Sequence, residues 1–362
     1  MIRNALWIMA LGVIFIPLVS CVNRKSEQAI EVGDLSDKYK GMAVSDLKAV
    51  DTIYSFTEDF PVDIRDAGDK MVLVFAKQDT ELQILDKEKR VVTPVAVAGN
   101  GPDDVNSPSF FQNNYITDDG KVGLYDLNRN ELVFVSADSA TISKKPLPDM
   151  LVRESCVNYF GNEAVSYAVM KTDNFFKISD LKANLSKDIP YPYKLSEESW
   201  EKIKSLPGYL APIIYADKKK NRIILAQFYF DMYSVYDMEG NFIKSVSLSD
   251  ENFDVDSAID SYYALDENGY IRYAPGAVSD EFVYLKRMKM VPDLKAQKYN
   301  KVENSIVKLD WDGNPLEIIV VPEGLGGFCI DKDGNIIAIV NSADEDGKDT
   351  ESYHIVRYAV GR

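Results

Sequence analysis

Histidine is almost absent from this chain of 362 residues, because His354 is its only example. A zinc site built from several histidines is therefore excluded by count, and a Ser-His-Asp triad would have to use His354. No glycine-rich phosphate-binding loop precedes a predicted helix, and the Ser-x-Asp-x-Gly-x-Thr-Trp repeats of sialidases are missing. The sequence thus offers no recognisable set of catalytic residues.

Basic residues are also scarce, since 41 lysines and arginines stand against 57 aspartates and glutamates and give a formal net charge of −16. Nucleic acids and anionic membrane surfaces repel a net anion, so neither is expected as a partner. The charge fits a solvated envelope protein, a cation binder, or a protein whose charge serves solubility alone.

Long apolar runs are limited to the N-terminus, where residues 5–19 follow Arg3. Leu18-Val19-Ser20-Cys21 then resembles the lipobox of bacterial lipoproteins, in which the signal peptide is removed before a cysteine that carries the lipid. The apolar run is short for a transmembrane span. An ordinary signal peptide and a transmembrane anchor are the alternatives.

We therefore predict a signal peptide over residues 1–20, lipidation at Cys21, and a polar, flexible tether over residues 21–48. Several acyl chains would hold such a protein firmly on a membrane. The expected location is the cell envelope, with the outer membrane favoured and the periplasmic or surface side left open. The lipid anchor is the only expected contact with the membrane.

Strand–turn–strand units recur through most of the remaining chain. Asp312-Gly313-Asn314 and Asp333-Gly334-Asn335 each separate two β-rich runs, and these residue types tolerate the positive φ of tight hairpin turns. The repetition predicts an all-β fold, a six-bladed β-propeller of four-stranded blades over residues 49–362. The predicted strands, blade by blade, are 62–65, 71–75, 81–85 and 91–97; 115–117, 121–125, 131–135 and 140–144; 156–160, 164–170, 175–179 and 187–189; 213–216, 222–227, 233–236 and 242–246; 262–265, 270–273, 306–309 and 316–320; and 328–330, 336–340 and 354–358.

Two features of this prediction concern the last blades. A basic segment, residues 285–302, interrupts the fifth blade as an insertion of unknown role. The sixth blade lacks a fourth strand, which residues 50–56 can supply, and this closure removes free sheet edges that would invite aggregation. Cys156 and Cys329 are expected on the innermost strands of facing blades, too far apart for a disulfide, and therefore as free thiols.

Three segments resemble a known family. They are Asp310-Trp311-Asp312-Gly313-Asn314-Pro315-Leu316, Phe328-Cys329-Ile330-Asp331 and Gly99-Asn100-Gly101-Pro102, and they are similar to segments of the six-bladed, TolB-like or NHL-like propeller lipoproteins of Gram-negative bacteria. The resemblance covers residues 50–362 and implies the fold. It implies no catalytic residues, because most members of the family are uncharacterised.

Loop lengths divide the predicted propeller into two faces. The turns between the first and second and between the third and fourth strands of a blade are short, whereas the connections on the opposite face are longer and carry aromatics. Because long loops on a rigid scaffold often bind ligands, the long-loop face is the predicted site. Alternatively, these loops only cover the channel mouth. The candidate ligand-binding residues are Asp103, Asp104, Asn106, Phe110, Phe111, Trp200, Tyr209, Asp254 and Asp256.

A helix is expected within residues 190–212. Ser196 can cap it, two glutamates favour its first turn, and Trp200 and Ile203 would share one face that covers a core.

No cofactor and no metal site are predicted. Calcium is the one cation considered, since carboxylates are abundant and prefer hard cations. The segments 310–314 and 331–335 look like calcium loops but lack the downstream glutamate of an EF-hand, and hairpin turns explain them. Asp103, Asp104, Asp254, Asp256 and Asp260 are better calcium candidates because they belong to the long-loop face.

The leading functional hypothesis is a lipid-anchored, non-enzymatic propeller that binds a ligand or an envelope protein partner. The alternative is a hydrolase or lyase that acts on carbohydrate through paired carboxylates. A third hypothesis is a docking part of an envelope complex. The sequence does not identify the ligand or the oligomeric state.

Overall fold

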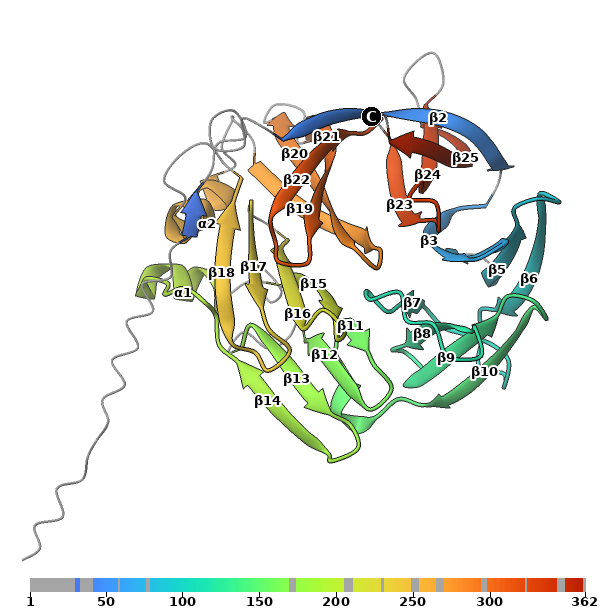
Figure 1. Cartoon of the computed structure of the whole chain (residues 1–362), viewed down its shortest axis with the longest axis horizontal. Helices are drawn as coiled ribbons and strands as arrows, with labels where there is room; N and C mark the ends of the chain where they lie inside the picture. Colours follow the sequence, from blue (N-terminus) through green and yellow to red (C-terminus); the bar gives the residue numbers. More distant parts are fainter. Residues whose placement is uncertain are drawn as a thin grey trace, which may run out of the picture.

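The structure of the chain is a computed structural model, and it is built almost entirely from β-sheets arranged around a central axis (Figure 1). The predicted all-β class is confirmed, and the arrangement is propeller-like. The structure describes residues 30–32, 42–57, 59–75, 79–168, 174–204, 211–228, 231–248, 254–264, 270–293, 298–322, 324–343 and 349–360.

Four blades are antiparallel meanders of four strands each. The first comprises β3 (Pro61–Ala67), β4 (Lys70–Phe75), β5 (Thr80–Asp86) and β6 (Val91–Val97), and the second β7 (Pro108–Phe110), β8 (Val122–Asp126), β9 (Glu131–Ser136) and β10 (Thr141–Pro146). The third comprises β11 (Cys156–Tyr159), β12 (Glu163–Tyr167), β13 (Phe176–Asp180) and β14 (Leu185–Ile189), and the fourth β15 (Pro212–Asp217), β16 (Arg222–Gln227), β17 (Met232–Tyr236) and β18 (Phe242–Ser247). A short strand, β1 (Ile30–Val32), pairs in parallel with β18.

The remaining strands form one eight-stranded sheet. Its first half contains β19 (Tyr270–Val278), β20 (Phe282–Asp293), β21 (Lys298–Asp310) and β22 (Pro315–Val320), and its second half β25 (Asp349–Val360), β24 (Ile336–Ala343) and β23 (Leu325–Ile330). The long strand β2 (Ala43–Phe56) joins the two halves. The structure therefore shows four blades and one larger sheet where the sequence predicted six separate blades.

Strand β2 changes partner along its length. Residues Ala43–Asp46 pair in parallel with β22, and Leu47–Phe56 pair antiparallel with β25. The predicted pairing of residues 50–56 with the last strand of the chain is thus confirmed. The strand begins earlier than predicted, so residues 43–48 do not belong to a tether. The early residues looked like a linker because they carry few buried side chains, and Val44 is 69% exposed.

Two strand predictions and the predicted insertion were wrong. The innermost strand of the second blade is β7, whereas residues 115–117 contribute only an isolated bridge between Ile116 and Val122. Residues 262–265 were predicted as a strand, but α2 (Val255–Ala264) occupies most of that range. The supposed insertion at 285–302 lies instead within the strands β20 and β21, which pair with each other over twelve register positions.

The short turns follow one repeated pattern. In each of three hairpins an aspartate backbone N–H donates to the asparagine carbonyl four residues later, while the aspartate carboxylate accepts from the amide and side chain of that asparagine. The glycine between them has a positive φ, 75° at Gly313 and 81° at Gly334. The predicted hairpins are therefore confirmed. The three turns are Asp237–Asn241, Asp310–Asn314 and Asp331–Asn335.

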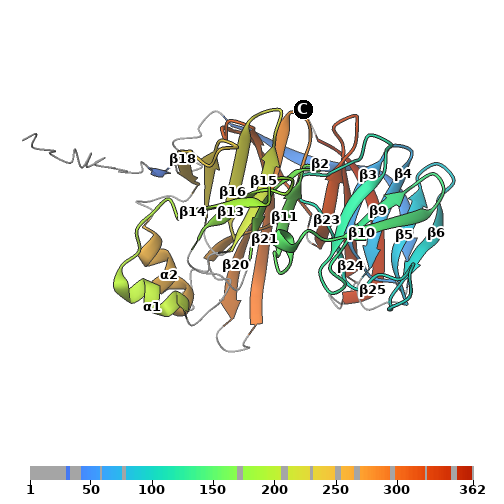
Figure 2. The same ribbon diagram turned by 90° about the horizontal axis from the view of Figure 1, so that it is seen from below.

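Two α-helices and a short 3-10 helix, η1 (Asp149–Leu151), complete the structure. Helix α1 (Glu197–Lys204) begins as predicted, because the Ser199 backbone N–H donates to Ser196 Oγ at 3.1 Å. Helices α1 and α2 lie together on one face of the molecule (Figure 2), which is the face of the long loops. No helix among the described residues is long and apolar enough to cross a membrane.

Candidate functional site

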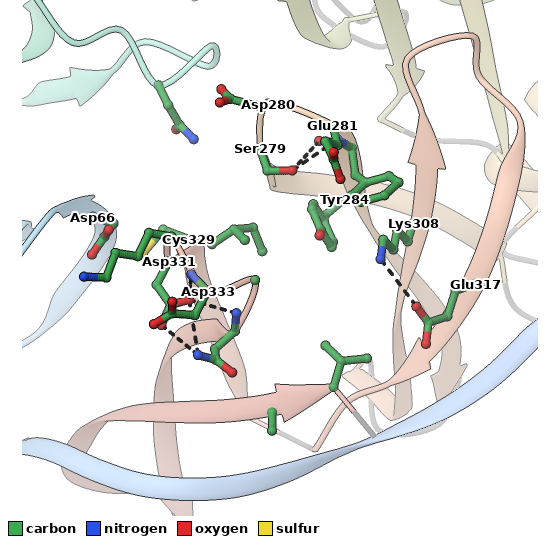
Figure 3. Close-up of a pocket in the computed structure, with 18 of the residues that line it drawn as sticks. Asp66, Ser279, Asp280, Glu281, Tyr284, Lys308, Glu317, Cys329, Asp331 and Asp333 are labelled. Carbon is green, nitrogen blue, oxygen red and sulfur yellow. Dashed lines mark hydrogen bonds and ion pairs between the residues drawn. The ribbon is translucent and has the colours of Figure 1, made fainter. Parts of the chain in front are cut away.

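A cavity of about 1150 Å³ opens on the short-turn face, opposite α1 and α2. The turn after β19, the turn after β23 and the start of β2 surround it, together with residues from the first two blades. Figure 3 shows β2, in blue, running along one side of this space.

Carboxylates dominate the charged lining, since six of them face three cations. Asp280 and Glu281 occupy the β19–β20 turn, and Asp333 lies across the open space in the β23–β24 turn (Figure 3). All three side chains are exposed, and no hydrogen bond or ion pair to their carboxylates is found among the described residues. These three groups, which we call the acidic rim, are available to a ligand.

The other carboxylates of the cavity already have partners. Asp66 forms an ion pair with Lys87 at 2.7 Å, and Glu317 lies 3.8 Å from Lys308 and accepts from the Ser45 hydroxyl. Burial raises the pKa of Asp66; the hydrogen bond and charge of Lys87 oppose this rise, and the nearby negative charge of Asp331 adds to it. Asp66 therefore keeps its proton to a higher pH than an ordinary aspartate does.

An aromatic wall faces the acidic rim. The Lys308 ammonium lies 4.0 Å from the centre of the Phe282 ring and 5.9 Å from that of Tyr284. Burial raises the pKa of Tyr284, so its hydroxyl stays protonated near neutral pH and can donate. The wall therefore offers apolar area and a cation that is already engaged by Glu317.

Two residues of the cavity lining each carry a buried polar atom that has no partner among the described residues. Arg65 on β3 is 4% exposed, and its Nε atom has no partner among the described residues. Asn114 donates through Nδ2 to the Val278 carbonyl at 2.9 Å, while its buried Oδ1 accepts nothing there. Both residues line the cavity.

The predicted residues of the 99–114 loop lie apart from this cavity. Asp103 is exposed, whereas the Asp104 carboxylate accepts from the Gly101 backbone N–H. The Asn106 backbone N–H donates to Asp126. The loop therefore uses Asp104 and the Asn106 backbone to hold its own conformation.

Phe110 and Phe111 are core residues, with 1% and 0% of their surface exposed. Phe110 packs between the first two blades, and Phe111 stacks on Tyr125 and Tyr159. As they stand, neither ring presents a surface to a ligand. A single sequence does not reveal that these two side chains are buried, which is why they were predicted as ligand-binding residues.

The remaining long-loop candidates gather around the two helices. Trp200 packs against the small core that contains Ile203, as predicted. Asp254 caps α2 by accepting from the Ser257 N–H, and Asp256 accepts from Ser196 and so ties α2 to α1. Burial tends to raise the pKa of Asp256, but hydrogen bonds from Ser199 and Ser196 outweigh it and leave that pKa below its ordinary value.

The predicted residues thus form two separate groups on the long-loop face. Asp260 forms an ion pair with Lys202 at 2.6 Å, which again joins the helices. Tyr209 and Cys21 lie outside the described residues. Within the described part of the chain, no three His, Cys, Asp or Glu side chains are grouped closely enough to hold a metal ion.

Two of the three cysteines and the histidine lie on strands of the described fold. Cys156 and Cys329 are free thiols on the innermost strands β11 and β23, as predicted. Burial raises the pKa of both thiols, to about 12 for Cys156. His354 on β25 lies 2.7 Å from the Ser55 hydroxyl of β2 and so supports the closing strand pair.

Sequence reasoning missed the cavity, although it identified one of its turns. The turn 331–335 was recognised as a hairpin, and its exposed Asp333 belongs to the acidic rim. Asp280 and Glu281 also follow a strand directly, which is a signal for a short polar turn. What the sequence could not show is that the start of β2 lines the same cavity as both turns, because its contact with β22, from Ser45 to Glu317, joins residues 272 positions apart.

No protein-family model and no curated protein sequence matches the chain. Among solved structures, a protein from Bacteroides fragilis described as exported is similar, with a TM-score of 0.53, 13% identity, and coverage of 92% of this chain and 99% of that one. A protein of unknown function from Bacteroides thetaiotaomicron has a TM-score of 0.46 and 11% identity, with 92% and 75% covered. Virginiamycin B lyase from Staphylococcus aureus has a TM-score of 0.41 and 12% identity, with 86% and 99% covered.

These similarities bear on the fold alone. At 13% identity, the likeness to the Bacteroides fragilis protein shows a shared architecture over almost the full length of both chains. The two weaker likenesses carry no argument about this chain.

Proposed function

We propose that this protein is a lipid-anchored propeller of the bacterial cell envelope that binds a polar, amine-bearing ligand in its short-turn cavity. In this proposal the eight-stranded sheet comprises the fifth and sixth blades of a six-bladed TolB-like or NHL-like lipoprotein, joined by β2. The proposal requires no cofactor. It replaces the long-loop face with the short-turn face as the first candidate site.

The acidic rim is the observation that carries the proposal. Asp280, Glu281 and Asp333 come from two turns distant in sequence, face one cavity, and have carboxylates with no partner among the described residues. Like charges held near each other repel, and a bound cation relieves that repulsion. Phe282, which is half-buried, adds aromatic surface on which the apolar part of a ligand can pack, whereas Tyr284 behind it is 3% exposed and belongs to the core.

The rim is tested with matched pairs of small probes, dialanine amide against N-acetyldialanine amide and glucosamine against N-acetylglucosamine. We expect each free amine to bind more tightly than its acetylated partner near neutral pH, and the difference to shrink in high salt. Asp280→Asn with Asp333→Asn should weaken binding of the amines about ten-fold, since each exposed ion pair contributes up to about 1 kcal/mol.

Asp103→Asn with Glu88→Gln is the matched control, because it removes the same charge from exposed sites outside the cavity. If this control weakens binding as much as the rim variant, or if acetylation makes no difference, the proposed site is wrong. In that case the long-loop residues or an envelope protein partner become the better candidates.

One observation favours the second candidate, a hydrolase or lyase that acts on carbohydrate. Asp66 has a raised pKa and is influenced by the charge of Asp331, which is the arrangement expected of an acid beside a base. Incubation of the protein with glycans, followed by analysis for cleaved products, decides between ligand binding and catalysis. Product formation that disappears in Asp66→Asn would show catalysis.

The anchor is tested separately at Cys21. A lipobox cysteine receives its lipid on the thiol, so Cys21→Ser should abolish lipid labelling and leave an uncleaved precursor or a soluble form. Labelling and membrane fractionation in cells measure both effects. Unchanged labelling would contradict the lipoprotein assignment while leaving the ligand proposal intact.

A further inference from the structure

Strand β1 fastens the N-terminal part of the chain to the outer edge of the fourth blade. It pairs with β18 from Ile30, opposite Ser245, to Val32, and so adds a fifth strand to that blade (Figure 1). The two strands are parallel, and β18 follows the turn Asp237–Asn241 on the short-turn face. The N-terminal end of β1 therefore points toward the short-turn end of the fourth blade.

This pairing shortens the reach of a lipid at Cys21. Cys21 precedes Ile30 by nine positions, which span at most about 30 Å when fully extended. It precedes Ala43, the first residue of β2, by 22 positions, which span about 75 Å. A domain of this size is about 50 Å across. With β1 in place, only the region around the fourth blade lies within reach of the membrane, whereas without β1 every side does.

Two hydrogen bonds join the short turns of the fourth blade to each other and to the third blade. Lys187 Nζ on β14 donates to the Glu239 carbonyl at 2.6 Å. The Met238 backbone N–H donates to Asn221 Oδ1 at 3.1 Å. These contacts draw three segments into one surface, which we call the blade-4 corner and which comprises residues 180–188, 217–222 and 237–244.

The blade-4 corner combines exposed apolar side chains with free lysines. Leu185 on β14 is 66% exposed, and Ile243 on β18 is 45% exposed. Lys219 and Lys220 are exposed in the β15–β16 turn, and no hydrogen bond or ion pair to their side chains is found among the described residues. Apolar side chains insert between lipid headgroups, and lysines extend their amines to the phosphates.

The charge of the corner also differs from that of the chain. Five lysines of the corner are exposed against three exposed acids, although the formal net charge of the chain is −16. One of these acids, Asp180, is held by its own turn, because its carboxylate accepts from the Lys182 and Ala183 backbone N–H groups. The corner therefore presents less negative charge to phosphate headgroups than the rest of the molecule does.

We propose that the blade-4 corner is the surface with which the protein lies on the phospholipid membrane that carries its anchor. Strand β1 sets this orientation, because it fixes the chain to β18 nine positions after Cys21. The inference rests on the proposed lipid anchor and is independent of the cavity. It adds a second membrane contact to the anchor, which the sequence led us to expect as the only one.

The test measures how fast single lysines react with acetic anhydride, by mass spectrometry, in the lipidated protein on phosphatidylcholine vesicles. The lipid-free chain that begins at Val22 gives the reference rate of each lysine. We expect Lys219 and Lys220 to react several-fold more slowly on vesicles than in the reference. Lys89 is the matched control and should react equally fast in both, because it is exposed on the short-turn face of the first blade.

A variant then assigns the orientation to β1. Glu31→Pro with Val32→Pro should abolish the protection of the two lysines, since proline donates no backbone hydrogen bond and two adjacent prolines affect both edges of the strand. Ser26→Pro with Glu27→Pro is the matched control. It places the same residues before β1, and protection should persist.

The outcomes separate the orientation from the anchor. Equal protection of Lys219, Lys220 and Lys89, or protection that survives the prolines in β1, would overturn the orientation. The mass of the N-terminal peptide shows whether Cys21 carries lipid. An unmodified Cys21 would overturn the anchor and this inference together, whereas a lipidated Cys21 with equal protection would overturn the inference alone.

Discussion

A chain that begins at Thr57 is expected not to fold into a stable propeller, because it lacks β2. Without β2, the edges of β22 and β25 lose their partner and the two halves of the eight-stranded sheet are no longer joined through it. Ile53 and Phe56 also leave the core, where they are 1% and 4% exposed. Losing one such side chain costs about 2–5 kcal/mol, and a whole domain is stable by only about 5–15 kcal/mol.

A chain that begins at Met42 is the matched control. It keeps every residue of β2 and removes β1 and all that precedes it, so its melting temperature should stay close to that of a chain beginning at Val22. Thermal melts and aggregation assays on the three proteins measure the effect. Equal stability of the chains that begin at Thr57 and Met42 would show that β2 does not close the structure.

The parts of the fold that the sequence predicts best are those encoded locally. The turn at Asp331–Asn335 carries its own cap, since the Asp331 carboxylate accepts from the Asn335 N–H, so its residues alone identify it. The run Arg222–Gln227 is apolar between its two end residues, and its predicted strand bounds are the ones that the structure shows. In such segments local propensity and tertiary packing agree.

The errors lie where neighbouring blades decide the structure. The basic stretch from Lys286 to Lys289 looked like a surface insertion, yet it belongs to β20. Tyr262–Ala264 looked like a strand because of its tyrosines, and it closes helix α2 instead. At Lys286 and Met288, each 8% exposed, burial by distant segments overrides the local pattern, and a single sequence does not contain that information.

The same dependence on distant segments explains why the sequence pointed to the long-loop face as the binding site. The long loops attracted attention because they contain Phe110, Phe111 and several aspartates, but the phenylalanines fill the core and Asp104, Asp254 and Asp256 hold loops and helices in place. The short turns at residues 279–281 and 331–335 looked purely structural, yet both line the cavity. The start of β2 completes that lining from a distant part of the chain.

The last prediction concerns two adjacent residues of β20, one of which links the two halves of the eight-stranded sheet while the other links that sheet to the fourth blade. Their side chains point to opposite faces of the strand, as alternation requires. Lys286 donates to the Leu325 and Gly326 carbonyls of β23, and Arg287 forms a two-bond ion pair with Asp231, at 3.0 and 2.8 Å, at the start of the β17 hairpin. The basic segment therefore joins the two halves of the eight-stranded sheet to each other and the first half to the fourth blade.

Arg287→Met should lower the free energy of unfolding by about 3–5 kcal/mol, because Asp231 is 2% exposed and would keep a buried charge without its guanidinium. The free energy of unfolding lost by the double variant, Asp231→Asn with Arg287→Met, should be smaller than the sum of the losses in the two single variants, because the double variant holds no charge at either position.

Arg222→Met is the matched control. The ion pair of Arg222 with Asp312 is as short, at 2.6 Å, but Asp312 is 65% exposed, so a loss within about 1 kcal/mol is expected. Denaturant melts measure all four proteins, and equal losses for Arg287→Met and Arg222→Met would show that the buried pair does not hold the fourth blade to the eight-stranded sheet.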